Sequence, residues 1–374
     1  MTLPLVVCDE KIVITDQLQR LPVALRLMPG RSIDRDSLEG ASALLTRTIT
    51  QVDASLLTDT KVRFVGTASA GTDHIDTECL ERRGIGFANA AGSNAYAVCD
   101  YIIAALVETG RIGDVLAGAS VGIVGYGHVG RQLAARLSGM GAVIRVYDPL
   151  VEDIPKPWGV DALQDVLDCD VVSLHAALHD SAHFPSRGLV GASEAALCRP
   201  GSLFINAGRG ELLADGALAT LFANGVDVVL DTWPGEPNIS IDTLGRVGLA
   251  TPHIAGYSKR SKAAATNLLL PSLREVLGIP SVDVTQVHNT AHHVIKASER
   301  STVSELLSAA LDHIGGLSAE DARMRSEMST SAKADAFDRL RHEYQLRDEL
   351  ADVCIQGVSG DTAKKLQSAG CQTV

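Results

Sequence analysis

The chain is long enough for two or three domains, and its composition is that of a globular protein. It has 374 residues, of which 46% are hydrophobic and 21% charged, and its formal net charge at pH 7 is −12. A chain this acidic is a poor match for nucleic acid or for an anionic membrane surface. We therefore expect neither a nucleic-acid partner nor membrane attachment.

The cysteines and the N-terminal residues favour a cytoplasmic protein. Seven cysteines are scattered along the chain and none forms a C-x-x-C pair, which is typical of free thiols in a reducing compartment. Residues 1–10 lack the basic start and the long apolar run of a signal peptide. No apolar run reaches the length of a membrane span.

The first part of the chain alternates short apolar runs with helical patterns, as α/β domains do. One helix is predicted over 76–83. A longer helix is predicted from Asn94 to about Leu116, because apolar residues recur there at helical spacing. Buried strands are predicted over the apolar runs 3–8, 43–45, 61–65 and 85–88.

A glycine motif after this helix predicts a dinucleotide site. Gly125, Gly127 and Gly130 form a G-x-G-x-x-G pattern between an apolar run over 121–124 and a helical pattern over 129–140. In such a motif the first glycine allows a tight turn and the second lets phosphates approach the backbone. The third lets the helix and the strand pack closely.

The residues around the glycines indicate NAD as the cofactor. His128 and Val129 open the helix, whose first N–H groups would hold the pyrophosphate. A second apolar run ends at Asp148, 18 residues after the last glycine of the motif. This carboxylate would accept hydrogen bonds from the adenosine ribose and repel a 2′-phosphate. The next two residues, Pro149 and Leu150, offer no arginine to a 2′-phosphate, so we predict NAD rather than NADP.

The alternation resumes after the motif and completes a cofactor domain. With the two strands beside the motif there are six, the count of a full doubly wound domain. A second long helix is predicted over 261–277, so the chain would leave a first domain, build the cofactor domain and cross back. The four further strands are predicted over 171–174, 203–205, 226–230 and 248–250.

The composition changes after Pro280 and predicts a small third domain. Residues 299–349 are rich in charge and helix formers. A strand is predicted over 352–356 and a last helix over 362–368.

Three polar side chains follow three successive predicted strands, at the strand ends where ligands bind in open α/β sheets. They are Arg209, Glu236 and His253. Arg209 could bind a carboxylate, His253 could exchange a hydroxyl proton near neutral pH, and Glu236 could bond the far ring nitrogen. Each could alone be a salt-bridge residue, a turn acid or a helix cap. Together, in a chain that binds NAD, they indicate hydride transfer coupled to proton transfer.

No metal site is expected from the sequence. His288 and His292 have a spacing that could place both on one helix face, but no third ligand follows in a recognisable pattern. A solvated surface is the better interpretation of this pair.

The chain resembles the D-2-hydroxyacid dehydrogenase family over essentially its whole length. Three blocks carry the resemblance, namely residues 63–76, 121–130 and 253–257. Residues 337–349 also resemble a C-terminal dimerisation domain that most relatives lack.

The resemblance implies an α/β fold in which a Rossmann-type doubly wound NAD domain is inserted in a flavodoxin-like substrate domain. A small α/β C-terminal dimerisation domain would follow. The expected boundaries are 1–93 and 257–285 for the substrate-binding domain, 94–256 for the NAD-binding domain and 286–374 for the dimerisation domain.

The resemblance places the catalytic roles on Arg209, Glu236 and His253, the same three residues that follow the strand ends. The substrate contacts that it implies fall on Thr48, Ser69 and Tyr257. The NAD contacts that it implies, beyond the glycine motif, fall on Asp148, Ala207, Gly208, Arg209, Asp231 and Gly256.

The implied reaction is oxidation of the C2 hydroxyl of 4-phospho-D-erythronate with NAD, a step in vitamin B6 biosynthesis. The expected partners are thus a small phosphorylated 2-hydroxy acid and a second copy of the chain. This sequence departs from the family at Ala176-Ala177, where relatives carry Thr-Pro, and over 186–189. Arg47, beside Thr48, is a further candidate for attracting an anion, although a surface salt bridge would explain it equally well.

Two alternatives stay open. One is another dehydrogenase of the same family, such as one that acts on 3-phosphoglycerate. The other is an NAD-sensing regulatory protein of the same fold, because such proteins keep the three catalytic side chains. The lack of a basic surface run and the enzyme-like C-terminal segment weigh against regulation.

Overall fold

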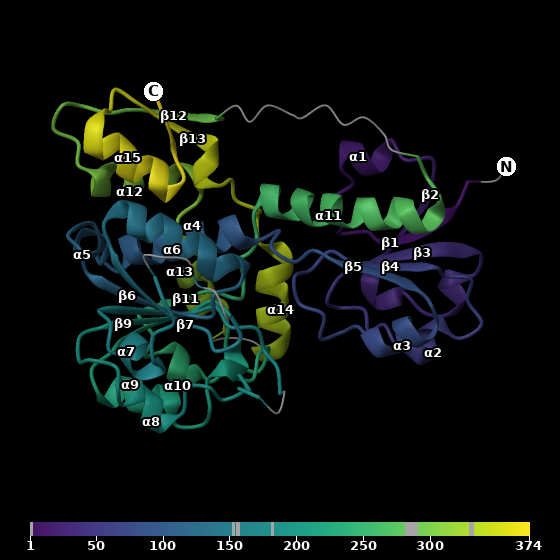
Figure 1. The fold of residues 1–374 in the computed structure, drawn as a ribbon, viewed down its shortest axis with the longest axis horizontal. Coiled ribbons are helices and arrows are strands. Elements are labelled where there is room, and N and C mark those ends of the chain that lie inside the picture. The colour runs from purple at the N-terminus through teal and green to yellow at the C-terminus, as the bar shows by residue number, and fades with distance from the viewer. Residues whose placement is uncertain (1–2, 152–153, 155–157, 181–182, 281–290, 329–332) are drawn as a thin grey trace. The chain divides into compact units, whose positions relative to one another are not determined.

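The computed structural model describes residues 3–151, 154, 158–180, 183–280, 291–328 and 333–374. The chain divides into two compact units (Figure 1), which we treat separately. The first unit is Met1–Asn94 with Ser258–His288, and the second is Ala95–Tyr257 with Asn289–Val374. Both units are built on parallel sheets flanked by helices, which confirms the predicted α/β class.

The first unit contains a five-stranded parallel sheet in the order β2-β1-β3-β4-β5. This is the strand order of flavodoxin-like domains, as expected. The strand β2 is not among the predicted strands, because it lies at the sheet edge and its Leu27 is 50% exposed. The strands are β1 (Leu5–Asp9), β2 (Ala24–Met28), β3 (Ala41–Thr46), β4 (Phe64–Thr67) and β5 (Gly86–Asn89).

The long helix α11 completes the core of the first unit. Leu269 and Leu273 of this helix are fully buried in one cluster with Val6 and Phe64 of the sheet. The Ser258 hydroxyl caps the start of α11 by accepting the Ser261 N–H at 2.9 Å. The helices of this unit are α1 (Asp16–Gln19), η1 (Gly30–Ser32), η2 (Asp36–Leu38), α2 (Ala54–Leu57), α3 (Thr77–Arg82) and α11 (Lys259–Leu277).

The second unit contains a six-stranded parallel sheet in the order β11-β10-β9-β8-β6-β7. All six strands were predicted. The strand order reverses between β6 and β8, and such a switch point is where dinucleotides bind. An isolated bridge between Val146 and Val160 extends the pairing beyond β7. The strands are β6 (Ser120–Val124), β7 (Val143–Tyr147), β8 (Val171–Leu174), β9 (Leu203–Asn206), β10 (Asp227–Leu230) and β11 (Leu249–Ala250).

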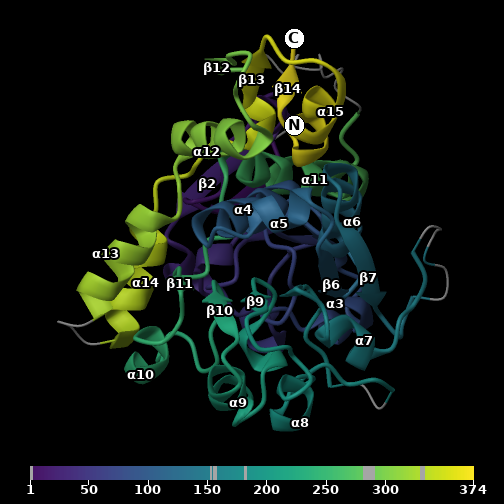
Figure 2. The same cartoon turned by 90° about the vertical axis from the view of Figure 1, so that its left-hand side faces the viewer.

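Helices cover both faces of this sheet (Figures 1 and 2). The single helix predicted from Asn94 to Leu116 is wrong. It is divided into two helices, because Gly110 adopts a left-handed φ of 73° that ends the first one. One face carries α4 (Ala95–Glu108), α5 (Ile112–Leu116) and α6 (His128–Met140), and the other carries α7 (Leu163–Leu167), α8 (Ala192–Ala195), α9 (Ala217–Ala223) and α10 (Ile241–Leu244).

The described residues of the C-terminal part form four α-helices, one short 3-10 helix and a small parallel sheet in the order β12-β13-β14. Buried residues of α12 and α15, such as Leu307 and Leu366, share one cluster with Leu133 of α6. Phe337 of α14 belongs to the cluster on the other face. The elements are β12 (His293–Lys296), α12 (Val303–Ile314), α13 (Ser318–Met328), α14 (Lys333–Glu343), η4 (Leu350–Asp352), β13 (Val353–Gln356), α15 (Gly360–Ala369) and β14 (Gln372–Thr373).

The helix α13 covers the edge of the large sheet at β11. Its Asp321 accepts the backbone N–H of Ala250 at 2.7 Å and pairs with Arg325 at 2.8 Å. Arg325 also donates to the carbonyls of Leu244 and Val247. A covered edge strand cannot pair with another chain.

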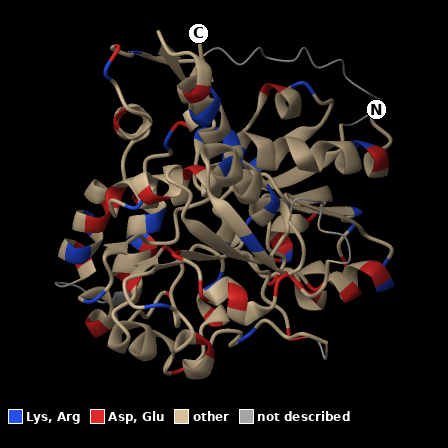
Figure 3. Cartoon of the chain, turned by 60° about the vertical axis from the view of Figure 1, so that its left-hand side comes forward, with Lys and Arg blue, Asp and Glu red and all other residues tan. Residues whose placement is uncertain are grey.

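Charged side chains of both signs are interspersed over the helices (Figure 3). Helices α13 and α14 illustrate this with the ion pairs that Arg323 and Arg339 form with Glu327. Within the described part of the chain, no helix is long and apolar enough to span a membrane.

Candidate active site

The three glycines of the motif differ in what surrounds them. A Cβ atom on Gly125 would lie 2.4 Å from the Ala176 nitrogen, and one on Gly130 would lie 2.0 Å from the Gly125 carbonyl oxygen. A Cβ atom on Gly127 would meet nothing within 4 Å. Gly125 and Gly130 are therefore needed for close packing, whereas Gly127 leaves space open at the start of α6. This is the arrangement that a pyrophosphate needs.

The start of α6 is suited to an anion. The helix begins at His128 with Gly127 as its N-cap, and no side chain caps it. The N–H groups of the first turn, which have no intrahelical partner, can therefore donate to phosphate oxygens.

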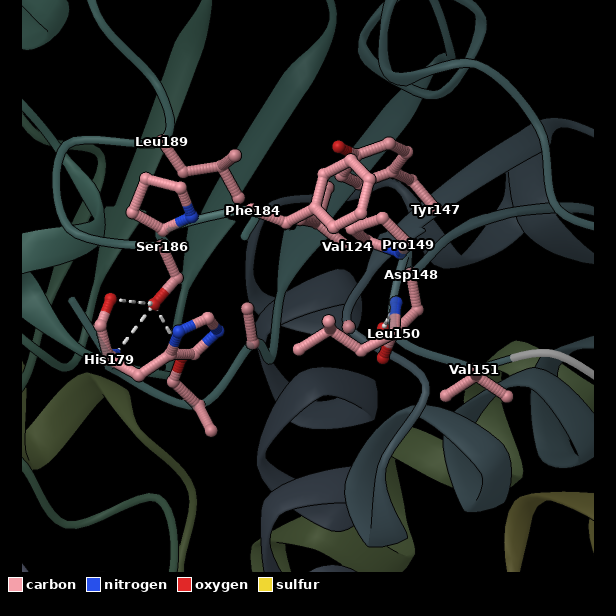
Figure 4. A pocket seen from close by; sticks show the side chains of 14 residues that line it. Val124, Tyr147, Asp148, Pro149, Leu150, Val151, His179, Phe184, Ser186 and Leu189 are labelled. Atoms are coloured by element: carbon pink, nitrogen blue, oxygen red, sulfur yellow. Dashed lines mark hydrogen bonds between the residues drawn. The ribbon is translucent and has the colours of Figure 1, made fainter. Parts of the chain in front are cut away.

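Asp148 stands at the end of β7 beside an open hollow of about 610 Å³ (Figure 4). Its carboxylate accepts the Tyr126 N–H at 2.7 Å and the Leu150 N–H at 3.0 Å, which fixes its position next to the glycine turn. His179 and Ser186 line the opposite side of the hollow. The remaining lining is mainly apolar, as an adenosine group requires, and consists of Val124, Gly125, Tyr147, Pro149, Leu150, Val151, Ala176, Ala177, Phe184, Pro185 and Leu189.

Glu236 and His253 form a direct pair at the ends of β10 and β11. The Oε1 atom of Glu236 lies 2.5 Å from Nδ1 of His253, and the two side chains are 20% and 25% exposed. Oε2 of Glu236 accepts the Trp233 N–H at 3.1 Å, which fixes the carboxylate. With Nδ1 engaged, Nε2 is the ring nitrogen left to exchange a proton with a substrate.

The surroundings of Glu236 keep it ionised. Burial alone would raise the pKa of Glu236. The hydrogen bond and charge of His253, the Trp233 N–H and the charge of Arg341 outweigh that effect, so the pKa is lowered from its ordinary value. An ionised Glu236 stabilises positive charge on the imidazole when the ring takes up a proton.

A buried carboxylate holds the loop that carries His253. Asp231 is fully buried, and its Oδ1 atom accepts the Thr251 hydroxyl and the Ile254 N–H, each at 2.7 Å. Its Oδ2 atom accepts the Ala255 N–H at 2.9 Å. Burial raises the pKa of Asp231, against the opposing effects of His253 and of these hydrogen bonds. The expected contact of Asp231 with NAD stays a prediction, and the structure adds this positioning role.

The backbone of His253 is held in an unusual conformation. Its φ is 56°, in the left-handed region that few side chains adopt. Its N–H donates to the Asp231 carbonyl at 2.8 Å, so the strained residue is tied to the end of β10.

Arg209 lies in the loop after β9, next to the loop that carries Glu236. Its Nη1 donates to the Gly208 carbonyl at 2.8 Å, and its own carbonyl accepts the Asn206 side chain at 2.9 Å. A Cβ atom on Gly210 would lie 2.0 Å from the Trp233 carbonyl oxygen, so the two loops pack directly together. Arg209 is thereby placed at the same sheet edge as the Glu236–His253 pair. Ala207 and Gly256 are half-buried in these loops.

Arg347, which no sequence pattern singled out, holds the same loop from the C-terminal side. It is 6% exposed. Its Nη1 donates to the carbonyls of Ile254 and Tyr257, each at 3.2 Å. Its Nη2 donates to the carbonyls of Ala97 and Ala255 at 2.7 and 2.6 Å. One guanidinium thus joins α4 to the loop around His253.

Arg341, near the end of α14, is a second arginine that the sequence did not reveal. Its Nη2 donates to the Tyr257 hydroxyl at 3.4 Å. Burial opposes the charge of Arg341, but Tyr257, Glu236 and Asp231 outweigh that effect, and the pKa of Arg341 is raised. Tyr257, a predicted substrate contact, therefore has a cation beside it.

The other two predicted substrate contacts, Thr48 and Ser69, belong to the first unit. Thr48 is exposed after β3, and the Ser69 hydroxyl lies 2.8 Å from the Thr67 hydroxyl. Arg47 binds the buried Asp9 carboxylate through Nε at 2.9 Å. Its predicted anion contact therefore competes with an ion pair inside the protein.

Comparison with known proteins decides the family. Residues 104–255 match a family model described as D-isomer specific 2-hydroxyacid dehydrogenase, NAD binding domain. The chain is 36% identical to the erythronate-4-phosphate dehydrogenase of Marinomonas sp. (strain MWYL1), an alignment that covers 92% of each chain. It is 37% identical to the erythronate-4-phosphate dehydrogenase of Marinobacter nauticus, with 94% of each covered. The chain belongs to the D-2-hydroxyacid dehydrogenase family.

Solved structures of D-2-hydroxyacid dehydrogenases share the fold. A 3-phosphoglycerate dehydrogenase from Entamoeba histolytica with bound NAD+ superposes with a TM-score of 0.61 at 22% identity, covering 74% of this chain and 95% of its own. A D-lactate dehydrogenase from Aquifex aeolicus gives a TM-score of 0.58 at 18% identity, covering 73% and 96%. The matched family model is an NAD-binding domain, so the prediction of NAD is confirmed.

Only one of the two histidines considered for a metal site lies among the described residues. His292 is described, and His288 lies outside the described residues. In the part of the chain that the structure describes, no group of three or more His, Cys, Asp or Glu side chains could hold a metal ion.

Two glycine substitutions should separate cofactor binding from folding. Gly127→Ala places its methyl group in open space, so we expect the free energy of unfolding to change by less than about 1 kcal/mol, while the Kd for NAD rises about tenfold or more. Gly130→Ala forces a methyl group against the Gly125 carbonyl, so we expect a loss of about 2 kcal/mol or more in stability. Urea unfolding and fluorescence titration with NAD measure the two effects. If both variants lost the same stability and showed the same change in the Kd for NAD, the assignment of Gly127 to the pyrophosphate would be contradicted.

Arg347→Lys should loosen the loop that carries His253 while keeping the positive charge. Arginine donates to the carbonyls of Ile254, Ala255 and Tyr257 from both of its Nη atoms. Lysine has a single nitrogen and cannot donate to all three, so buried carbonyls would lose their donor. We expect unfolding to become easier by about 2–4 kcal/mol, with a lower kcat. Arg339→Lys, on an exposed ion pair of α14, is the control and should change stability by less than about 1 kcal/mol. If Arg347→Lys were as stable as the control, the hydrogen bonds of Arg347 to the loop carbonyls would not be needed for stability.

Proposed function

We propose that the chain oxidises 4-phospho-D-erythronate with NAD, giving 2-oxo-3-hydroxy-4-phosphobutanoate, as a step in pyridoxal 5′-phosphate biosynthesis. The observation that carries this proposal is the similarity over 92–98% of the chain to relatives that bear the name erythronate-4-phosphate dehydrogenase. The Glu236–His253 pair, at a sheet edge next to the Arg209 loop, supplies the acid–base chemistry that such an oxidation needs.

The side chains suggest how the reaction proceeds. NAD, held by the glycine turn and Asp148, would supply the acceptor for the hydride. Arg209 binds the substrate carboxylate and draws electron density from the adjacent carbonyl oxygen as it forms. Nε2 of His253 takes the proton from the C2 hydroxyl, and Glu236 stabilises the resulting imidazolium through Nδ1. The ketone, the reduced cofactor and one proton on His253 balance the reaction.

The remaining contacts are proposed from the family pattern. The substrate would meet Thr48, Ser69 and Tyr257. The cofactor would be held by the glycine turn, His128, Val129, Asp148, Ala207, Gly208, Arg209, Asp231 and Gly256. The open space at Gly127 and the hollow beside Asp148 support this placement of NAD.

We also propose a homodimer that works in the cytoplasm, with residues 286–374 as the C-terminal dimerisation domain. The seven cysteines are all free and buried, which suits a reducing compartment. The strand β12 is an edge of its sheet and its Val294 is 53% exposed, which suits contact with a second copy.

The substrate is tested by following NADH formation on a set of acids. We expect the highest kcat/KM with 4-phospho-D-erythronate, above 3-phosphoglycerate and D-lactate. His253→Gln should lower kcat by about 10²–10⁴-fold, because the proton acceptor is lost, and should leave the Kd for NAD unchanged. A chain with no preference for the phosphorylated four-carbon acid, or a His253→Gln variant with full activity, would reject the proposal.

The dimer is tested by light scattering of the full chain. The expected molar mass is twice the 39.3 kDa of one chain. A mass of one chain at micromolar concentration would contradict the dimer and leave the catalytic proposal untouched.

A further inference from the structure

Arg341 is a half-buried cation, and no carboxylate is hydrogen-bonded to it among the described residues. Its Nε atom is buried and has no hydrogen-bond partner among the described residues. Its Nη2 makes a long contact of 3.4 Å with the Tyr257 hydroxyl. A buried N–H donor without an acceptor is unfavourable unless a ligand supplies one, and Nε of Arg341 is such a donor.

The other arginines of this region are satisfied. Arg323 and Arg339 each bind the Glu327 carboxylate. Arg325 binds Asp321 and two carbonyls, and Arg347 binds carbonyls with both of its Nη atoms. Arg341 alone among these five is aimed at the catalytic loop with unused donors.

The position of Arg341 joins it to the reacting groups. Tyr257 follows the catalytic loop and packs against Tyr344 of the C-terminal part, with the ring centroids 6.3 Å apart. Glu236 and Asp231 are close enough for their charges to act on Arg341. A ligand that meets Tyr257 would therefore meet this guanidinium as well.

We propose that Arg341 binds the phosphate group of the substrate. This inference rests on the proposed function, in which Arg209 already takes the carboxylate at the other end of the acid. A phosphate dianion provides the acceptors that the guanidinium lacks, and it can take two parallel N–H bonds. The Tyr257 hydroxyl would donate to the same phosphate.

The two sets of similar proteins differ in how much of this chain they cover. The solved family members cover 73–75% of this chain, whereas the relatives named for erythronate 4-phosphate cover 92–98%. The C-terminal part that carries Arg341, Asn289–Val374, makes up about the share of the chain that the first group leaves uncovered.

The test compares two substrates that differ only in the phosphate, 4-phospho-D-erythronate and D-erythronate. For Arg341→Met we expect kcat/KM on the phosphorylated acid to fall roughly 30- to 1,000-fold, and kcat/KM on D-erythronate to change less than about threefold. Inorganic phosphate should inhibit the wild type competitively and inhibit Arg341→Met at least about tenfold more weakly. Arg341→Lys keeps the positive charge but cannot donate two parallel hydrogen bonds. Its kcat/KM on the phosphorylated acid should fall less than that of Arg341→Met.

The controls separate binding from positioning. Arg339→Met, two residues away on the same helix and in an exposed ion pair, should behave as wild type on both substrates. If Arg341 acted only by holding Tyr257, Arg341→Met would weaken both substrates equally and would add nothing in a Tyr257→Phe background. That result would overturn the inference.

Two further outcomes are distinguishable. A wild type that oxidises both acids equally well would reject the proposed function itself. A wild type that prefers the phosphorylated acid, with an Arg341→Met variant that folds, binds NAD and keeps the preference, would reject only the role of Arg341.

Discussion

The carboxylate of Asp231 is the interaction on which the site depends. It stands at the end of β10, fully buried, and accepts three hydrogen bonds from the loop that carries His253. A buried charge is unfavourable unless its acceptor positions are filled, so these three hydrogen bonds favour the observed arrangement of the loop. The same residue accepts the His253 N–H with its carbonyl, which keeps the left-handed backbone of His253 in place. These hydrogen bonds thereby fix the position of His253 relative to the sheet.

Arg347 acts on the other side of the same loop. Its guanidinium binds the carbonyls of Ile254, Ala255 and Tyr257, so the N–H groups of the loop face an anion and its carbonyls face a cation. Neither charge could be buried there without the peptide groups between them. The loop is therefore fixed by polar contacts rather than by apolar packing.

Local sequence patterns were sufficient to predict the sheet and the glycine turn of the cofactor domain and the helices α6 and α11. The glycine motif, the six apolar runs and the helical period of α6 and α11 each depend on neighbours in the chain, and all were predicted. Strands β2, β12 and β14 were not. The first two are edge strands with exposed side chains, which carry a weak pattern, and β14 is only two residues long. The break between α4 and α5 depends on the left-handed conformation of Gly110, which a helical apolar pattern hides.

The candidate site was predictable where it follows strand ends and unpredictable where distant segments meet. Arg209, Glu236 and His253 each follow a strand of one sheet. Arg341 and Arg347 come from the far end of the chain, and only tertiary packing brings them to the loop. A faint signal did exist for Arg341, since Phe337, Leu340, Arg341 and Tyr344 recur at helical spacing and place a basic residue on the apolar side of a helix.

The order of the chain gives the Arg347 contact a consequence for biosynthesis. The contacts of Asp231 can form once Ala255 has left the ribosome, whereas Arg347 is synthesised 92 residues later. At roughly 5–20 residues per second, several seconds pass between the two events. The nascent chain thus contains every residue of the six-stranded sheet before it contains the arginine that holds the His253 loop. A translation product that stops short of Arg347 would carry the Asp231 side of this arrangement without the arginine side.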